Sequence, residues 1–160
     1  MAFLKQNMNQ FTQSPILGAV DLIPTPNVVT GQILPSTSAT AIQNGSAVKL
    51  RAGTSGALLV DVQTGPTDAA VFGVIPYNEQ KNLYKGGDFV EILRGGYMYM
   101  LTSAAVTRGA RVAITAATAS ADPTVAADAT SGHFTAGIAI DEASASGQLI
   151  RVSIEPLTNP

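Results

Sequence analysis

One short pattern, a glycine followed by alternating apolar residues, recurs three times and constrains the fold more than any other feature of the chain. It has the form Gly-x-x-Val-x-(Leu/Ile) and occurs at Gly45–Leu50, Gly87–Ile92 and Gly109–Ile114. Glycine permits a turn with positive φ. The alternation that follows places valine and leucine or isoleucine on one face of a strand. The pattern therefore predicts a turn followed by a strand at each of the three places.

A second pattern is an apolar run interrupted by one glycine, at Phe72–Ile75 and at Thr135–Ile140. Such a run is typical of a buried strand that a neighbouring strand approaches closely. The two patterns follow one another in the same order in residues 45–76 and again in residues 109–141. This order indicates a weak internal repeat.

Clear alternation also predicts strands at 57–63, 97–102 and 148–155. Glycine-rich turns separate the predicted strands, and the run Arg94–Gly96 divides residues 89–101 into two of them. About eight short strands at this spacing are typical of a barrel or sandwich rather than of alternating helices and strands. We therefore predict one all-β domain over 45–160, a small antiparallel β-barrel or jelly-roll-like sandwich.

Residues 1–44 differ in composition from the rest and predict an extended N-terminal arm. They contain four prolines but only two charges, Lys5 and Asp21. Proline disfavours both helices and central strands, whereas apolar residues scattered along an extended chain suit a surface laid against a partner. The arm residues predicted to anchor on an adjacent subunit are Phe3, Leu4, Phe11, Ile16 and Leu17.

The segment 77–93 concentrates charge in a chain that has little of it. Five of the 20 charged residues lie in these 17 positions. Charged and tyrosine-bearing loops fix the register of protein interfaces, so we predict that this connection contacts a neighbouring subunit; a solvated loop is the alternative. The predicted contact residues are Tyr77, Glu79, Lys81, Tyr84 and Lys85.

Charge and composition also argue against several classes of function. The net charge is −2 without a basic block, which argues against nucleic-acid binding. There is no cysteine, no apolar stretch of membrane-spanning length, no secretory signal and no phosphate-binding glycine motif, so we expect no cofactor and no membrane. Charged residues make up only 12% of the chain, which suits a surface largely covered by other protein.

Catalytic and metal sites are not expected. His133 is the single histidine and lies in a predicted turn, where a metal site is improbable. The adjacent acids Asp141 and Glu142 fit a solvated turn. A β-fold hydrolase would require two of Asp61, Asp88 and Glu91 to face one cleft, although alternation explains each as an outward or turn position.

The stretch from Gly45 to Glu155 resembles the capsid decoration or cement proteins of tailed bacteriophages. The resemblance rests on the proline-rich arm and on the segments GSAVKL, FGVIPYNEQKNLYKGGDFVEIL, MYMLTSAAVTRGARVAI and AGIAIDEASASGQLIRVSIE. It covers about two thirds of the chain, and it is one of pattern because none of these motifs is chemically specific.

The resemblance implies a non-enzymatic virion protein made in the host cytoplasm and bound to the capsid exterior. Its partners would be the major capsid protein and further copies of itself, as a homodimer or homotrimer. It would bridge neighbouring capsid subunits and stabilise the head against internal DNA pressure. The alternative is a carbohydrate- or host-surface-binding β module, in which Tyr97 and Tyr99 would be exposed along a groove.

Overall fold

The computed structural model describes residues 20–21, 26–34, 42–52, 58–78, 80–81, 83–115 and 122–158. Every regular element in these ranges is a β-strand, which confirms the all-β prediction, and the described residues include no helix long and apolar enough to span a membrane. The strands are β1 (Val20–Asp21), β2 (Asn27–Ile33), β3 (Ile42–Gln43), β4 (Ala47–Leu50), β5 (Leu59–Val62), β6 (Gly73–Val74), β7 (Leu83–Tyr84), β8 (Phe89–Thr102), β9 (Arg111–Ile114), β10 (Thr124–Ala127), β11 (Phe134–Ala139) and β12 (Leu149–Thr158). They outnumber the eight expected because strands of two residues are too short to show alternation.

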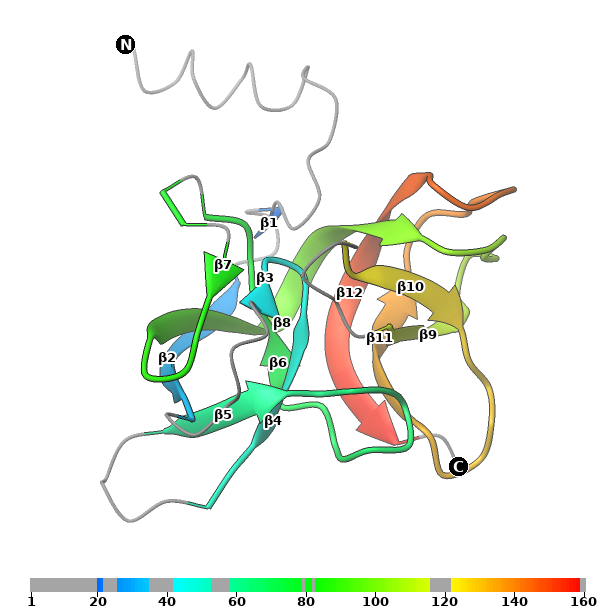
Figure 1. The fold of residues 1–160 in the computed structure, drawn as a ribbon. Coiled ribbons are helices and arrows are strands. Elements are labelled where there is room, and N and C mark those ends of the chain that lie inside the picture. Colours follow the sequence, from blue (N-terminus) through cyan, green and yellow to red (C-terminus); the bar gives the residue numbers. More distant parts are fainter. Residues whose placement is uncertain are drawn as a thin grey trace, which may run out of the picture.

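Strand pairing closes two rings that share the long strand β8. The first ring runs β8–β2–β5–β4–β6 and returns to β8, and the second runs β8–β12–β11–β9–β10 and returns to β8. We call them the first and the second barrel; Figure 1 shows the first on the left, the second on the right, and β8 passing between them. Each ring contains one parallel pairing, β2 with β5 and β10 with β8, so the barrels are mixed rather than wholly antiparallel.

The two barrels repeat the same pairing register. In the first, Val48 lies opposite Gly73, and in the second, Val112 lies opposite Gly137. The remaining ring pairings agree in the same way: Val48–Val62 with Val112–Ala127, Ile33–Val60 with Thr102–Val125, Val29–Ile92 with Met98–Val152, and Val74–Leu93 with Ile138–Ser153. The weak repeat in the sequence is thus present in the structure as two equivalent five-stranded barrels.

Both glycine patterns have the roles that the sequence predicts. Gly45, Gly87 and Gly109 have φ of 87°, 90° and 81° and precede β4, β8 and β9. A Cβ atom at Gly73 would lie 2.6 Å from the carbonyl oxygen of Leu93, and one at Gly137 would overlap a neighbouring backbone carbonyl. Only glycine therefore allows the strands to approach at these equivalent positions.

Strand β8 corrects the prediction of two strands separated by a turn. It continues for 14 residues through Gly95 and Gly96. Gly96 has φ of 123°, and its Cα lies close to Pro26, because a Cβ there would be 3.2 Å from that residue. These glycines bend β8 rather than end it, so its first half completes one barrel and its second half begins the other (Figure 1).

Each barrel has its own buried core. The first contains Ile33, Ile42, Val48, Val60, Ile75, Tyr84, Val90 and Ile92. The second contains Met98, Met100, Val106, Val112, Ile114, Val125, Ala136, Ala139, Ala143, Ile150, Val152 and Ile154, together with four residues of the first barrel and its connections, Ala47, Val71, Val74 and Leu93. The first barrel therefore helps to close the second.

The range predicted as an arm, residues 1–44, contains three described strands, β1, β2 and β3. β1 pairs with Tyr97 and Met98, and β2 is a full member of the first barrel with Ile33 completely buried. The arm hypothesis is thereby restricted to residues before β1, which lie outside the described residues.

Candidate interaction surface

One end of each barrel is closed by a short pairing between two connections. In the first barrel this is the pair Ile42–Tyr84 of β3 and β7, and in the second it is the isolated bridge Val106–Ala143. All four residues are buried, at 2%, 5%, 2% and 6% exposure. We call this the loop end; it is the end at which β2 finishes and β8 begins.

The first barrel uses a longer chain than the second to close its loop end. Residues 76–83, eight in number, join Ile75 to Tyr84, whereas residues 140–142, three in number, join Ala139 to Ala143. Because the second barrel closes with five residues fewer, the extra length is not required by the fold. This extra loop is the charge-rich segment that the sequence analysis singles out.

The extra loop and its continuation expose apolar side chains. Tyr77, Leu83 and Phe89 are 40%, 45% and 67% exposed. Lys81 and Lys85, in the same stretch of chain, are also exposed. We call these five residues the loop-end surface. It combines apolar side chains with two lysines, of which Lys81 is paired with Asp88.

Tyr84 differs from its predicted role as a contact residue. Its side chain is only 5% exposed and belongs to the first core, because β3 and β7 turn it inward opposite Ile42. Burial raises the pKa of Tyr84, and Lys81 lies 5.3 Å from its ring centroid. Tyr84 thus anchors the loop rather than offering a surface.

Hydrogen bonds to Asp88 order the loop. The Nζ of Lys81 lies 2.8 Å from Oδ2 of Asp88, and the backbone N–H of Lys85 donates to the same oxygen at 2.8 Å. The bond from Lys81, and then that from Lys85, hold the pKa of Asp88 below its ordinary value. At the start of the loop, Gln80 donates its backbone N–H to the side chain of Asn78.

The remaining predicted contact residues lie outside the described residues. These are Glu79 in the loop and Phe3, Leu4, Phe11, Ile16 and Leu17 in the arm.

Tyr97 and Tyr99 are half-buried, while Met98 and Met100 on the opposite face of β8 are fully buried in the core.

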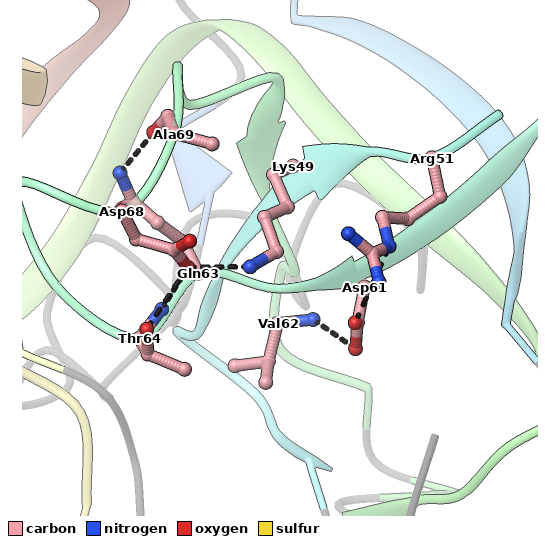
Figure 2. A network of polar contacts seen from close by, with 8 residues as sticks. All are labelled: Lys49, Arg51, Asp61, Val62, Gln63, Thr64, Asp68 and Ala69. Carbon is pink, nitrogen blue, oxygen red and sulfur yellow. Dashed lines mark hydrogen bonds and ion pairs between the residues drawn. The ribbon is translucent and has the colours of Figure 1, made fainter. Parts of the chain in front are cut away.

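The acids considered for catalysis are distributed as separate ion pairs. Figure 2 shows Asp61 beside Arg51, 3.7 Å apart, next to a second group formed by Lys49, Asp68 and Thr64. Asp88 pairs with Lys81, and Glu91 is exposed on β8. Asp61 and Asp88 are thus held in two different ion pairs.

Ion pairs of the same kind occur in the second barrel. Asp141 accepts two hydrogen bonds from the Arg151 guanidinium, at 2.9 Å each, which lower its pKa. His133 lies 2.8 Å from Asp128 across a turn. Across the described ranges, no group of three or more histidine and acidic side chains is placed to hold a metal ion.

Comparison with known proteins adds the family. The sequence profile of a family described as "Structural cement protein (E217 gp24/Pam3 gp6)" matches residues 4–155. The chain belongs to this family. It is thus a phage structural cement protein, a non-enzymatic component of the virion with a capsid-bound role.

Solved structures and curated protein sequences were also compared with this chain. The cement protein is similar to a chain described as the head fiber gp8.5 N base in bacteriophage phi29, with 14% identity over 83% of this chain and 98% of the other, at a TM-score of 0.45. Among curated protein sequences, none matches this chain.

Sequence reasoning missed two members of the loop-end surface. Phe89 lies on the outward face of β8, because it alternates with the buried Val90. The alternation after Gly87 could therefore have predicted its exposure. Leu83 lies in the two-residue strand β7, where no alternation can be read.

Proposed function

We propose that this cement protein binds the outside of a phage head, bridges neighbouring major capsid subunits and stabilises the head against internal DNA pressure. The observation that carries the proposal is the distribution of exposed apolar side chains. Within the described ranges, the exposed large apolar residues all belong to the first barrel and its connections: Val28, Leu50, Tyr77, Leu83 and Phe89. The described residues of the equivalent barrel beside it include no such exposed side chain, so the fold alone does not explain the exposure.

The loop-end surface is the proposed contact with the capsid. Protein interfaces combine a dry apolar centre with a polar rim that fixes register. Phe89, Leu83 and Tyr77 supply the apolar area, while Lys81 and Lys85 supply the rim. Glu79 completes the rim in this proposal.

The arm is the proposed second contact. Phe3, Leu4, Phe11, Ile16 and Leu17 would each bury a modest apolar area on an adjacent subunit, and many copies around one head multiply that energy. Association of the cement protein as a homodimer or homotrimer would place several arms on neighbouring subunits.

Cosedimentation with expanded, undecorated heads tests the proposal. We expect saturable binding of the wild-type protein and a higher melting temperature of the decorated heads. Absence of binding at micromolar protein would contradict the cement reading for these heads.

A loop variant tests the surface within the same experiment. Replacing Tyr77 and Lys85 by alanine should weaken binding about tenfold, because the loss of one interface anchor costs more than about 1 kcal/mol and an exposed charge at the rim contributes less. The matched control replaces Glu142, which is exposed in the short connection of the second barrel, and Ser144, which is exposed just after it. This control should bind like wild type. Equal binding by both variants would remove the loop end from the contact.

A further inference from the structure

The second end of the first barrel is also exposed, and the second barrel shows what normally covers it. This end, where β4 finishes and β2 begins, we call the open end. Leu50 at the open end is 52% exposed, although it alternates with the core residue Val48 and should point inward. Its counterpart in the second barrel, Ile114, is 2% exposed.

Neighbouring positions repeat this difference. Val29 is partly buried at the open end, whereas its counterpart Met98 is completely buried. In the second barrel the core is completed by side chains from outside that barrel, including Val74 and Leu93. The first barrel lacks an equivalent cover among the described residues, so its interior reaches the surface.

The open end has room for an apolar side chain. A hollow of about 250 Å³ lies between the end of β4 and the chain before β6, lined by Lys49, Leu50 and residues 69–72. Val28, 41% exposed, lies at the same end of the barrel. The guanidinium of Arg94 stacks 4.4 Å from the ring of Phe72.

The two basic residues that flank Leu50 at the hollow, Lys49 and Arg51, are each paired with an acid. Lys49 lies 2.5 Å from Asp68, and Arg51 lies 3.7 Å from Asp61 (Figure 2). A rim of paired charges attracts neither a cationic nor an anionic segment, so the chemistry of the open end suits an occupant that is apolar and nearly uncharged.

The N-terminal arm has this chemistry. Residues 1–19 contain several large apolar side chains and one charge, Lys5. Nineteen extended residues reach up to about 60 Å, which is enough to cross to another molecule. The described chain begins at β1, whose Val20 and Asp21 pair with Met98 and Tyr97, in the half of β8 that belongs to the second barrel and not to the first.

We propose that the open end of the first barrel receives the N-terminal arm of a second copy of this chain. One apolar residue of the arm would fill the hollow beside Leu50, and the other apolar residues of the arm would remain for an adjacent capsid subunit. The exchange would link copies through a surface at the opposite end of the barrel from the loop-end surface. It would therefore leave the loop end free for the capsid, and it does not depend on capsid binding.

Cysteine cross-linking in solution, without capsids, tests the exchange directly, because the natural chain contains no cysteine. Single variants Phe3→Cys, Phe11→Cys and Ile16→Cys are each mixed with Leu50→Cys under mild oxidation. We expect at least one mixture to form the mixed disulfide with about a tenfold higher yield than the same arm variant mixed with Phe89→Cys, since docking raises the effective concentration. Phe89 is the matched control because it is more exposed than Leu50.

Sedimentation velocity of the full chain gives an independent readout. Leu50→Glu should shift the protein from an oligomer toward the monomer, while Phe89→Glu should not. Equal cross-linking at Leu50 and Phe89 would overturn the proposal. A Phe11→Cys/Leu50→Cys double variant whose disulfide forms only within one chain would also overturn it, and would assign the hollow to the chain's own arm. A Leu50→Glu variant that loses capsid binding while its oligomeric state is unchanged would overturn it too, and would assign the hollow to the capsid.

Discussion

The two barrels have equivalent strands in equivalent register, yet the surfaces that they present differ. Position 50 is exposed in the first barrel, and its counterpart at 114 is core in the second. The loop that closes the first barrel has eight residues where the second has three. The pairing register is the same in both barrels, so the fold requires it. The loop length and the exposure at position 50 differ between the barrels, so they are available for binding.

The face through which the first barrel packs on the second differs from its counterpart in the second barrel. The outward residues of the first barrel that pack on the second include Val74 and Leu93. Their counterparts on the second barrel are Ile138 and Ser153, and Glu155 follows on the same strand. The second barrel therefore presents a more polar face at the equivalent positions.

The largest expected effect tests whether the two glycine approaches are equivalent. Gly137→Ala and Gly73→Ala should each lower the free energy of unfolding by about 3 kcal/mol or more, because a Cβ atom would collide with backbone. Urea unfolding measures the loss. Gly65→Ala is the control, since nothing lies within 4 Å of its Cβ position and it should stay near wild type. A stable Gly137→Ala protein would break the equivalence of the barrels.

The next comparison is between a buried and an exposed tyrosine of the same segment, Tyr84 and Tyr77. Tyr84→Ala should cost about 3 kcal/mol, the usual loss for a large core aromatic. Tyr77→Ala should change stability by less than about 0.5 kcal/mol, as expected at an exposed site. Thermal unfolding of both variants decides the assignment, and similar losses in the two would show that the loop is packed differently.

Leu50 and Ile114 provide the same comparison at the other end. Ile114→Ala should destabilise the protein by about 2–4 kcal/mol, whereas Leu50→Ala should cost less than about 1 kcal/mol because its side chain is half exposed. The measurement is urea unfolding at low protein concentration. A loss at Leu50 as large as that at Ile114 would mean that the open end is closed in the isolated chain.

The smallest effect concerns the ion pair beside the open end. The hydrogen bond from Lys49, followed by the backbone N–H of Thr64, lowers the pKa of Asp68 from its ordinary 3.8 to about 2. A carboxyl whose pKa is lower in the folded state stabilises the protein above its unfolded pKa, and this contribution is lost as pH falls from 3.8 toward 2. Lys49→Met should therefore cost about 1 kcal/mol at pH 7, given the partial exposure of both groups, and progressively less toward pH 2. A difference from wild type that does not change between pH 7 and pH 2 would mean that Lys49 acts through packing alone.

The sequence predicted the β class and the internal repeat because alternation and glycine placement are local signals. It divided β8 because Gly95–Gly96 has the composition of a turn, whereas the contact of Gly96 with Pro26 that makes it a bend is non-local. The charged loop was identified from composition, but the inward turn of Tyr84 depends on its pairing with Ile42, 42 positions earlier. The open end at Leu50 could not be predicted, since exposure there depends on which neighbour covers it.

Hydrogen exchange measured on the free protein and on decorated heads tests the central claim most directly. The account predicts that capsid binding slows exchange in residues 76–89 of the first barrel and leaves residues 140–149, the equivalent connection of the second barrel, unchanged. Protection of 140–149 without protection of 76–89 would contradict it and would assign capsid binding to the second barrel.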